Sequence, residues 1–134
     1  MLSVHASTIR LFIHVLAATI WVGGQLTLAG LLPVLRGLGP DATRAAARQF
    51  DRLAWPAFGV LIATGVWNLL EVEIGSTSIE YQITVAVKLS LVAVSGIGAA
   101  LHRGATSKAL LAAGGAASAV GALGALFIGI QLRT

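Results

Sequence analysis

The chain has 134 residues, of which 57% are hydrophobic and only 10% are charged, whereas about a quarter of the residues of a typical soluble domain are charged. This composition excludes a soluble globular domain and predicts an all-α integral membrane protein. The net charge of +4 comes from basic residues in short segments between apolar runs, which indicates membrane topology and contact with anionic lipid, not nucleic-acid binding. The absence of cysteine excludes disulfides, thiolate metal sites and thiol catalysis.

Four apolar runs follow one another along the chain. Each is close to the roughly 20 residues that a helix needs to cross a bilayer. They cover residues 11–32, 53–72, 83–101 and 109–132. We therefore expect a single domain over residues 1–134, folded as a four-helix membrane bundle. The first run is too long for a signal peptide, and no cleavage-type sequence of small residues precedes the basic segment that follows it.

The segments that join the runs differ in charge. Residues 33–52 contain four arginines against two aspartates, and Arg103 and Lys108 follow the third run, whereas the opposite side carries three glutamates, at positions 71, 73 and 80. The positive-inside rule therefore places both basic segments in the cytoplasm and both termini on the extracytoplasmic side. We expect a multi-pass protein of the bacterial inner membrane.

The first basic segment, residues 33–52, has the turn residues of a loop. Within it, Asp41 is expected to cap a short helix that lies at the membrane surface. The chain would then restart or bend at Trp55-Pro56 as it enters the second span.

Two ionisable residues lie inside the apolar runs, His14 in the first and Lys88 in the third. A lysine at the centre of a spanning helix costs roughly 2.5–3.5 kcal/mol on insertion scales, and such residues usually face a bundle interior or a water-filled cavity. With both termini outside, each would lie roughly 6–8 Å deep in the outer leaflet, so the two side chains can meet in one site. His102 lies at the cytoplasmic end of the third run, too far from His14 to bind the same metal. The structural alternatives are a hydrogen bond from His14 to a neighbouring carbonyl and snorkelling of Lys88 to the surface.

Helical periodicity extends these residues into polar stripes, because residues seven apart lie on nearly the same face of a helix. The expected stripes are His14, Trp21 and Gln25 on the first helix, Thr64, Asn68 and Glu71 on the second, and Lys88, Ser95 and His102 on the third. The fourth run contains no ionisable group. Its small residues form ridges that allow close packing, either inside the bundle or at a homodimer interface: Gly121, Ala125 and Gly129, and Gly114, Ser118 and Ala122.

Residues 14–24, His-Val-Leu-Ala-Ala-Thr-Ile-Trp-Val-Gly-Gly, resemble the first helix of the copper resistance protein D family, in which a histidine is followed seven residues later by Trp-x-Gly-Gly. Residues 64–69 resemble the end of the next helix of that family, and Lys88 matches the lysine that opens its third helix. The resemblance implies a small membrane protein with a redox or metal-handling role.

A more distant resemblance is to the bacterial membrane protoporphyrinogen IX oxidase family, whose members associate with haem b. The first-helix histidine and third-helix lysine of that family match His14 and Lys88. This chain has Leu35-Arg36 where that family has a second histidine after the first span, which argues against oxidase activity.

Haem b suits these residues better than a dedicated copper pathway, because Cu(I) favours thioether ligands and the only methionine is Met1. Haem requires one or two axial ligands and walls of small and aromatic residues. We expect His14 to be the metal ligand and Lys88 to be a second ligand or the cation that pairs with a propionate. The other candidate cofactor-binding residues are Trp21, Gly24, Trp67 and Asn68. Copper bound at His14 is the alternative cofactor.

Three functions stay open from the sequence. The first is a haem- or copper-binding protein in electron transfer or metal handling. The second is a non-catalytic membrane accessory subunit. The third is a protoporphyrinogen IX oxidase-like enzyme that passes electrons to quinone. No catalytic residue is identified. The expected partners are the lipid bilayer, a second copy or a larger membrane complex, and quinone or another redox protein.

Overall fold

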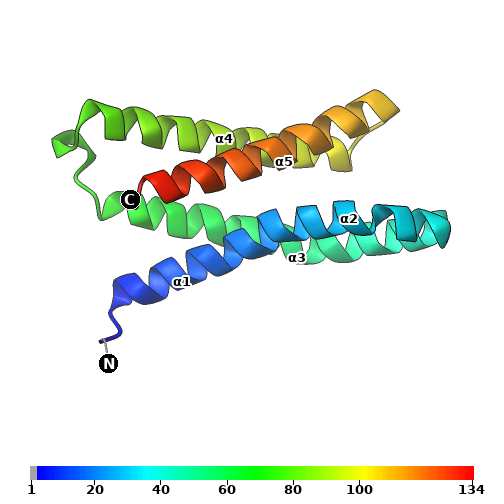
Figure 1. Cartoon of the computed structure of the whole chain (residues 1–134), viewed down its shortest axis with the longest axis horizontal. Helices are drawn as coiled ribbons and strands as arrows, with labels where there is room; N and C mark the ends of the chain where they lie inside the picture. Colours follow the sequence, from blue (N-terminus) through cyan, green and yellow to red (C-terminus); the bar gives the residue numbers. More distant parts are fainter. Residues whose placement is uncertain (1–2) are drawn as a thin grey trace. The chain divides into compact units, whose positions relative to one another are not determined.

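The computed structural model describes residues 3–134, which are helical apart from short connections and contain no strand. The elements in chain order are α1 (Ala6–Ala18), η1 (Thr19–Gly23), α2 (Gly24–Gly37), α3 (Pro40–Leu70), η2 (Ile74–Ser76), α4 (Ile79–Arg103) and α5 (Lys108–Gln131). Element η1 is a single π-helical turn that continues α1 into α2, and η2 is a short 3₁₀ turn. Figure 1 shows the helices in this order.

Within residues 3–134, four helical runs are long and apolar enough to cross a membrane. They are Ala6–Gly37, Pro40–Leu70, Ile79–Arg103 and Lys108–Gln131. The all-α membrane fold with four spanning helices is therefore confirmed. Each run contains most of one apolar segment expected from the sequence.

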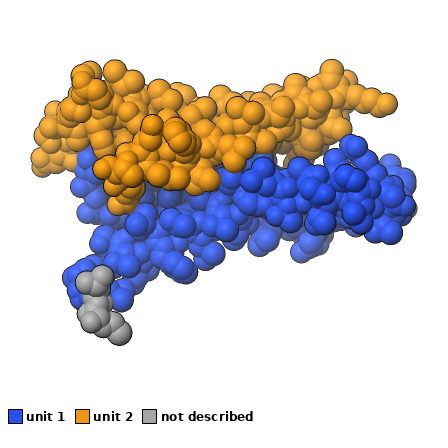
Figure 2. All heavy atoms as spheres, in the orientation of Figure 1, with its two compact units in different colours: residues 1–72 blue, residues 73–134 orange. Residues whose placement is uncertain are grey.

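The chain divides into two compact units, coloured separately in Figure 2. Unit 1 ends at Val72 and unit 2 covers Glu73–Thr134. Within unit 1, the continuous helix α1–η1–α2 packs along α3, and within unit 2, α4 packs along α5. Each unit is a helical hairpin.

The hairpin turn of unit 1 is much shorter than the loop expected over residues 33–52. Helix α2 continues to Gly37 and α3 begins at Pro40, so only Leu38 and Gly39 separate them. Gly39 has a φ of +105°, which a residue with a side chain rarely adopts. Pro40 suits the first turn of α3 because it has no N–H to satisfy there.

The expected cap and surface helix in this segment were wrong. Gly39 precedes the helix, and Asp41 lies inside its first turn, where its carboxylate pairs with Arg44 at 3.3 Å. At 1.5 Å per residue, the 31 residues of α3 measure about 46 Å, longer than the roughly 30 Å hydrocarbon core. The charged residues occupy the end of α3 nearest the hairpin turn, so the helix continues beyond the apolar core instead of ending there.

The hairpin of unit 2 depends on backbone contact between α4 and α5. A Cβ at Gly98 would come within 2.6 Å of the Ser118 amide nitrogen, and one at Gly121 within 2.7 Å of the Leu91 carbonyl oxygen. The Ser95 hydroxyl donates to the Ser118 carbonyl at 2.9 Å across the same contact. The small residues predicted to form a packing ridge on α5 therefore pack within the chain, against α4.

Candidate functional site at the α1–α3 interface

His14 lies on α1 and faces α3. Its Nδ1 atom is 2.7 Å from the Oγ1 atom of Thr64. The next residue of α3 is Gly65, where a Cβ would lie 3.6 Å from His14 Cε1, so the imidazole ring lies against a helix surface with no side chain at that position. The contact with Thr64 thus orients the ring of His14 against α3.

An ion-pair network lies one helical turn from His14, toward the N-terminus of α1. Arg10 donates from Nε to Asn68 Oδ1 at 2.8 Å, and its Nη1 lies 3.5 Å from Glu71 Oε1. The guanidinium carbon also lies 5.3 Å from the centre of the Trp67 ring, and the indole Nε1 donates to Glu71 Oε1 at 3.2 Å. The Arg10 side chain is only 12% exposed. The network fastens α1 to α3 beside His14.

Two of the predicted cofactor-binding residues, Trp67 and Asn68, belong to this network. Both make their side-chain contacts with Arg10 or Glu71. Sequence reasoning missed Arg10 as part of the site. The available signal was its position four residues before His14, which places both side chains on one face of the helix.

Trp21 lies on the other side of His14, within the π-helical turn of η1. Its side chain is 3% exposed. Its ring centre lies 4.3 Å from that of Phe58 and 5.6 Å from that of Trp55, the latter pair meeting edge to face. π-Helical turns occur frequently at functional sites. The expected face of α1 is confirmed, since His14 and Trp21 both face α3.

Gly24 allows the Phe50 ring of α3 to approach α2. A Cβ at Gly24 would come within 2.5 Å of Phe50 Cε2. Among the predicted cofactor-binding residues, Gly24 therefore has a packing role in the structure.

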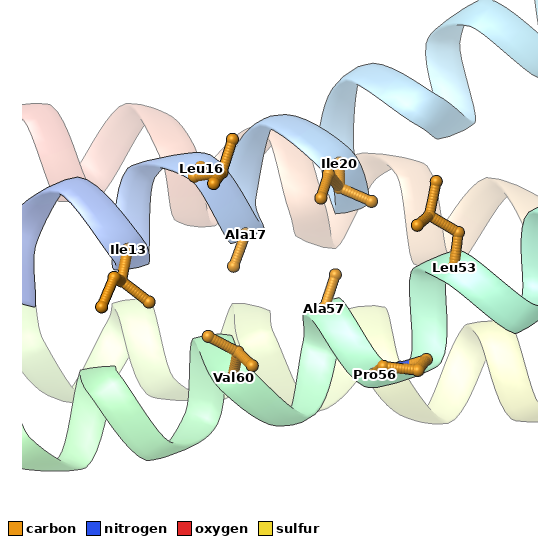
Figure 3. Close-up of a pocket in the computed structure, with 8 residues that line it drawn as sticks. All are labelled: Ile13, Leu16, Ala17, Ile20, Leu53, Pro56, Ala57 and Val60. Atoms are coloured by element: carbon orange, nitrogen blue, oxygen red, sulfur yellow. The ribbon is translucent and has the colours of Figure 1, made fainter.

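An apolar cavity of about 330 Å³ lies between the α1–η1 segment and α3 (Figure 3). Hydrocarbon side chains from both helices line it, together with Pro56. The lining residues are Ile13, Leu16, Ala17 and Ile20 from α1 and η1, and Leu53, Pro56, Ala57 and Val60 from α3. The alanines leave room between the helices. The cavity adjoins the polar part of the interface at Val60, whose carbonyl accepts a hydrogen bond from Thr64.

Lys88 belongs to unit 2, where it lies against α5. A Cβ at Gly129 would come within 3.2 Å of Lys88 Nζ, so this glycine gives the ammonium group its space. In the described part of the chain, residues 3–134, no hydrogen bond or ion pair joins the side chain of Lys88 to another residue. Because His14 lies in unit 1, the predicted convergence of the two residues stays a prediction.

His102 lies in the last turn of α4. Its Nδ1 atom donates to the Leu111 carbonyl at 2.7 Å. A Cβ at Gly115 would come within 2.9 Å of the same nitrogen, so the ring packs directly on α5. The three stripe residues of α4, Lys88, Ser95 and His102, all face α5, as their seven-residue spacing predicts.

The four membrane-length helices and the polar interface at His14 define a small multi-pass membrane protein. Residues 44–131, more than half of the chain, match the family model described as Copper resistance protein D, and the chain belongs to that family. The match includes Trp67, Asn68 and Lys88, and it begins after His14, Trp21 and Gly24. Neither a curated protein nor a solved structure matches the chain.

Proposed function

We propose that this member of the copper resistance protein D family binds haem b through His14 and serves as a redox subunit in metal handling. The observation that carries the proposal is the contact between His14 Nδ1 and Thr64 Oγ1 at 2.7 Å. A histidine that binds a metal through one ring nitrogen almost always uses the other nitrogen in a hydrogen bond that fixes the orientation of the ring. Thr64 supplies that partner from a neighbouring helix.

The surroundings of His14 also suit a flat apolar cofactor. The α1–α3 interface that contains His14 also has a cavity of about 330 Å³ lined by hydrocarbon, and this volume lies within the usual range for ligand pockets. The indole of Trp21 and the small residues Ala17 and Ala57 stand along the same interface. These groups would exclude water from the cofactor and so favour electron transfer over reaction with solvent.

The ligand set favours haem over a copper ion bound by protein alone. Within residues 3–134, no group of three or more histidine, aspartate or glutamate side chains is arranged to hold a metal ion. A copper site made of side chains requires several nitrogen or sulfur ligands. Haem brings its own equatorial nitrogens and needs only one or two axial ligands from the protein. When bound, it would supply one-electron chemistry.

Lys88 has the second role in this proposal, as the cation for a propionate or as a second ligand. The proposal keeps both termini on the extracytoplasmic side of a bacterial inner membrane, since the basic residues gather at the α2–α3 turn of unit 1 and the α4–α5 turn of unit 2. The electron partner would be quinone or another redox protein.

The test is the absorption spectrum and metal content of the protein purified in detergent. The wild-type protein is expected to show a Soret band and to contain about one iron atom per bound haem. His14→Ala is expected to lose the band. His102→Ala serves as the matched control, because it removes an imidazole that also bonds through Nδ1 but lies in unit 2, and it should keep the band.

Two results would contradict haem binding. One is a colourless wild-type protein that also fails to take up added haemin. The other is a His14→Ala variant that differs from wild type only in stability, which would favour the accessory-subunit function. If the purified wild-type protein contained copper and no iron, His14 would be assigned as a copper ligand and not as a haem ligand.

A further inference from the structure

We propose that Thr64 is a positioning residue that keeps the proton of His14 on Nδ1 and thereby leaves the lone pair on Nε2. The inference adds to the proposed function which nitrogen of His14 binds the iron. It rests on the proposed function only for that assignment. The protonation pattern itself follows from hydrogen-bond geometry on α1 and α3.

The Thr64 hydroxyl has a single hydrogen to donate. The Thr64 oxygen lies 2.7 Å from the Val60 carbonyl oxygen and 3.3 Å from that of Leu61. Carbonyl oxygens only accept hydrogen bonds, so the hydroxyl must donate at this contact. Donation to the carbonyl four residues earlier is the common behaviour of threonine within a helix. The Thr64 oxygen then has only lone pairs left for other partners.

The Nδ1 atom of His14 must supply the hydrogen in its contact with Thr64. His14 Nδ1 lies 2.7 Å from the same Thr64 oxygen, a distance at which a hydrogen must lie between the two atoms. Because the Thr64 hydrogen is directed at Val60, the hydrogen in this contact belongs to Nδ1. The neutral ring is therefore the Nδ1–H tautomer, with its basic lone pair on Nε2. A neutral histidine in water prefers the other tautomer, so the interface reverses the ordinary preference.

The contact between His14 and Thr64 lies in a closely packed part of the α1–α3 interface. The Thr64 side chain is buried, with 7% exposure of the residue. The Arg10–Asn68 hydrogen bond of 2.8 Å holds the same two helices together one turn away. The ring also lies close to the Gly65 backbone, where a Cβ would be in ordinary van der Waals contact with His14 Cε1 at 3.6 Å. The chain of bonds from His14 through Thr64 to the Val60 carbonyl thus holds the imidazole in one orientation, with Nδ1 directed at α3.

The direct test is ¹⁵N NMR of histidine-labelled protein free of haem, with the His14 signals assigned by their loss in His14→Ala. The wild-type protein is expected to show a protonated Nδ1 and an unprotonated Nε2 in neutral His14. Thr64→Ser should keep this pattern, because the serine hydroxyl retains both the donor and the acceptor. Thr64→Val has nearly the same shape but no acceptor, and it should shift His14 toward the Nε2–H tautomer.

A wild-type His14 with the proton on Nε2, or an unchanged His14 in Thr64→Val, would overturn the inference. Neither outcome depends on haem, so the failure of haem binding is distinguishable from the failure of this inference. In the loaded protein, Thr64→Val should weaken haem binding roughly 10–100-fold and Thr64→Ser should restore it, the usual effect of losing the orienting partner of a metal ligand. Equal haem affinity in the two variants would limit Thr64 to a packing role.

Discussion

Gly98→Leu is expected to separate α4 from α5 and to be among the most destabilising single substitutions in unit 2. A side chain at this position would meet the Ser118 amide nitrogen and the Gly114 carbonyl oxygen, at 2.6 and 2.8 Å from its first carbon. Both atoms belong to the backbone of α5, so no side-chain rotation relieves the clash. We expect a loss of about 3 kcal/mol, at the upper end for overpacking in a close-packed interior, measured by circular dichroism during unfolding in mixed detergent micelles.

Ala100→Leu is the matched control for this substitution. Ala100 lies two residues further along α4, and its side chain is exposed. The same enlargement there should change the free energy of unfolding by less than about 0.5 kcal/mol, as for exposed positions in general. Equal effects of the two substitutions would contradict the close α4–α5 packing.

Trp21→Ala is expected to destabilise unit 1 by about 3–5 kcal/mol, the usual range when a buried aromatic residue is truncated to alanine. Trp21 is 3% exposed and packs on Phe58 and Trp55 of α3, with ring centres at 4.3 and 5.6 Å. Its removal leaves a cavity and loses both ring contacts. The measurement is the midpoint of thermal unfolding in detergent for wild type, Trp21→Ala and Trp21→Phe, in which Trp21→Phe should recover part of the loss.

Phe12→Ala provides the control on the same helix. Phe12 is 65% exposed, so its truncation should have little effect on the unfolding midpoint. A Trp21→Ala protein as stable as Phe12→Ala would show that the aromatic cluster of Trp21, Trp55 and Phe58 contributes little to unit 1.

Much of the fold could be predicted from apolar length and helical period. The apolar runs lie within the four membrane-length helices because backbone groups in a bilayer must be satisfied inside each segment. The seven-residue spacing also correctly predicted which side of each helix faces its neighbour in unit 1. His14 and Trp21 face α3, and Thr64, Asn68 and Glu71 make their contacts with His14 or Arg10 of α1.

The segment over residues 33–52 could not be predicted by the same reasoning. Its arginines, glycines and prolines are typical of a loop, yet Pro33 lies inside α2 and Pro40 lies at the start of α3. Proline tolerates the first turn of a helix, and alanine and arginine favour the helical interior. Charge therefore marks where the chain leaves the apolar core, and it does not mark where the helix ends.

The partners within the site depend on contacts between helices, which periodicity does not specify. The expected stripes contained Thr64 and His14 on separate helices, but only the structure shows their contact of 2.7 Å. Arg10 was missed because it lies just before the first apolar run, outside the polar stripe expected on that helix, whereas it connects Asn68, Glu71 and Trp67. The pairing of His14 with Lys88 stays a prediction, since a matched depth along two helices leaves their lateral positions undefined.

The most direct test of the proposal that His14 binds haem is chemical rescue with free imidazole. The His14→Gly variant lacks the imidazole but leaves space beside Thr64 for a free one. We expect it to lack the Soret band, to regain the band when imidazole is added, and to respond less to 1-methylimidazole, which has no N–H to donate to Thr64. An unchanged haem spectrum in His14→Gly without added imidazole would show that another residue binds the iron and would contradict the central role of His14.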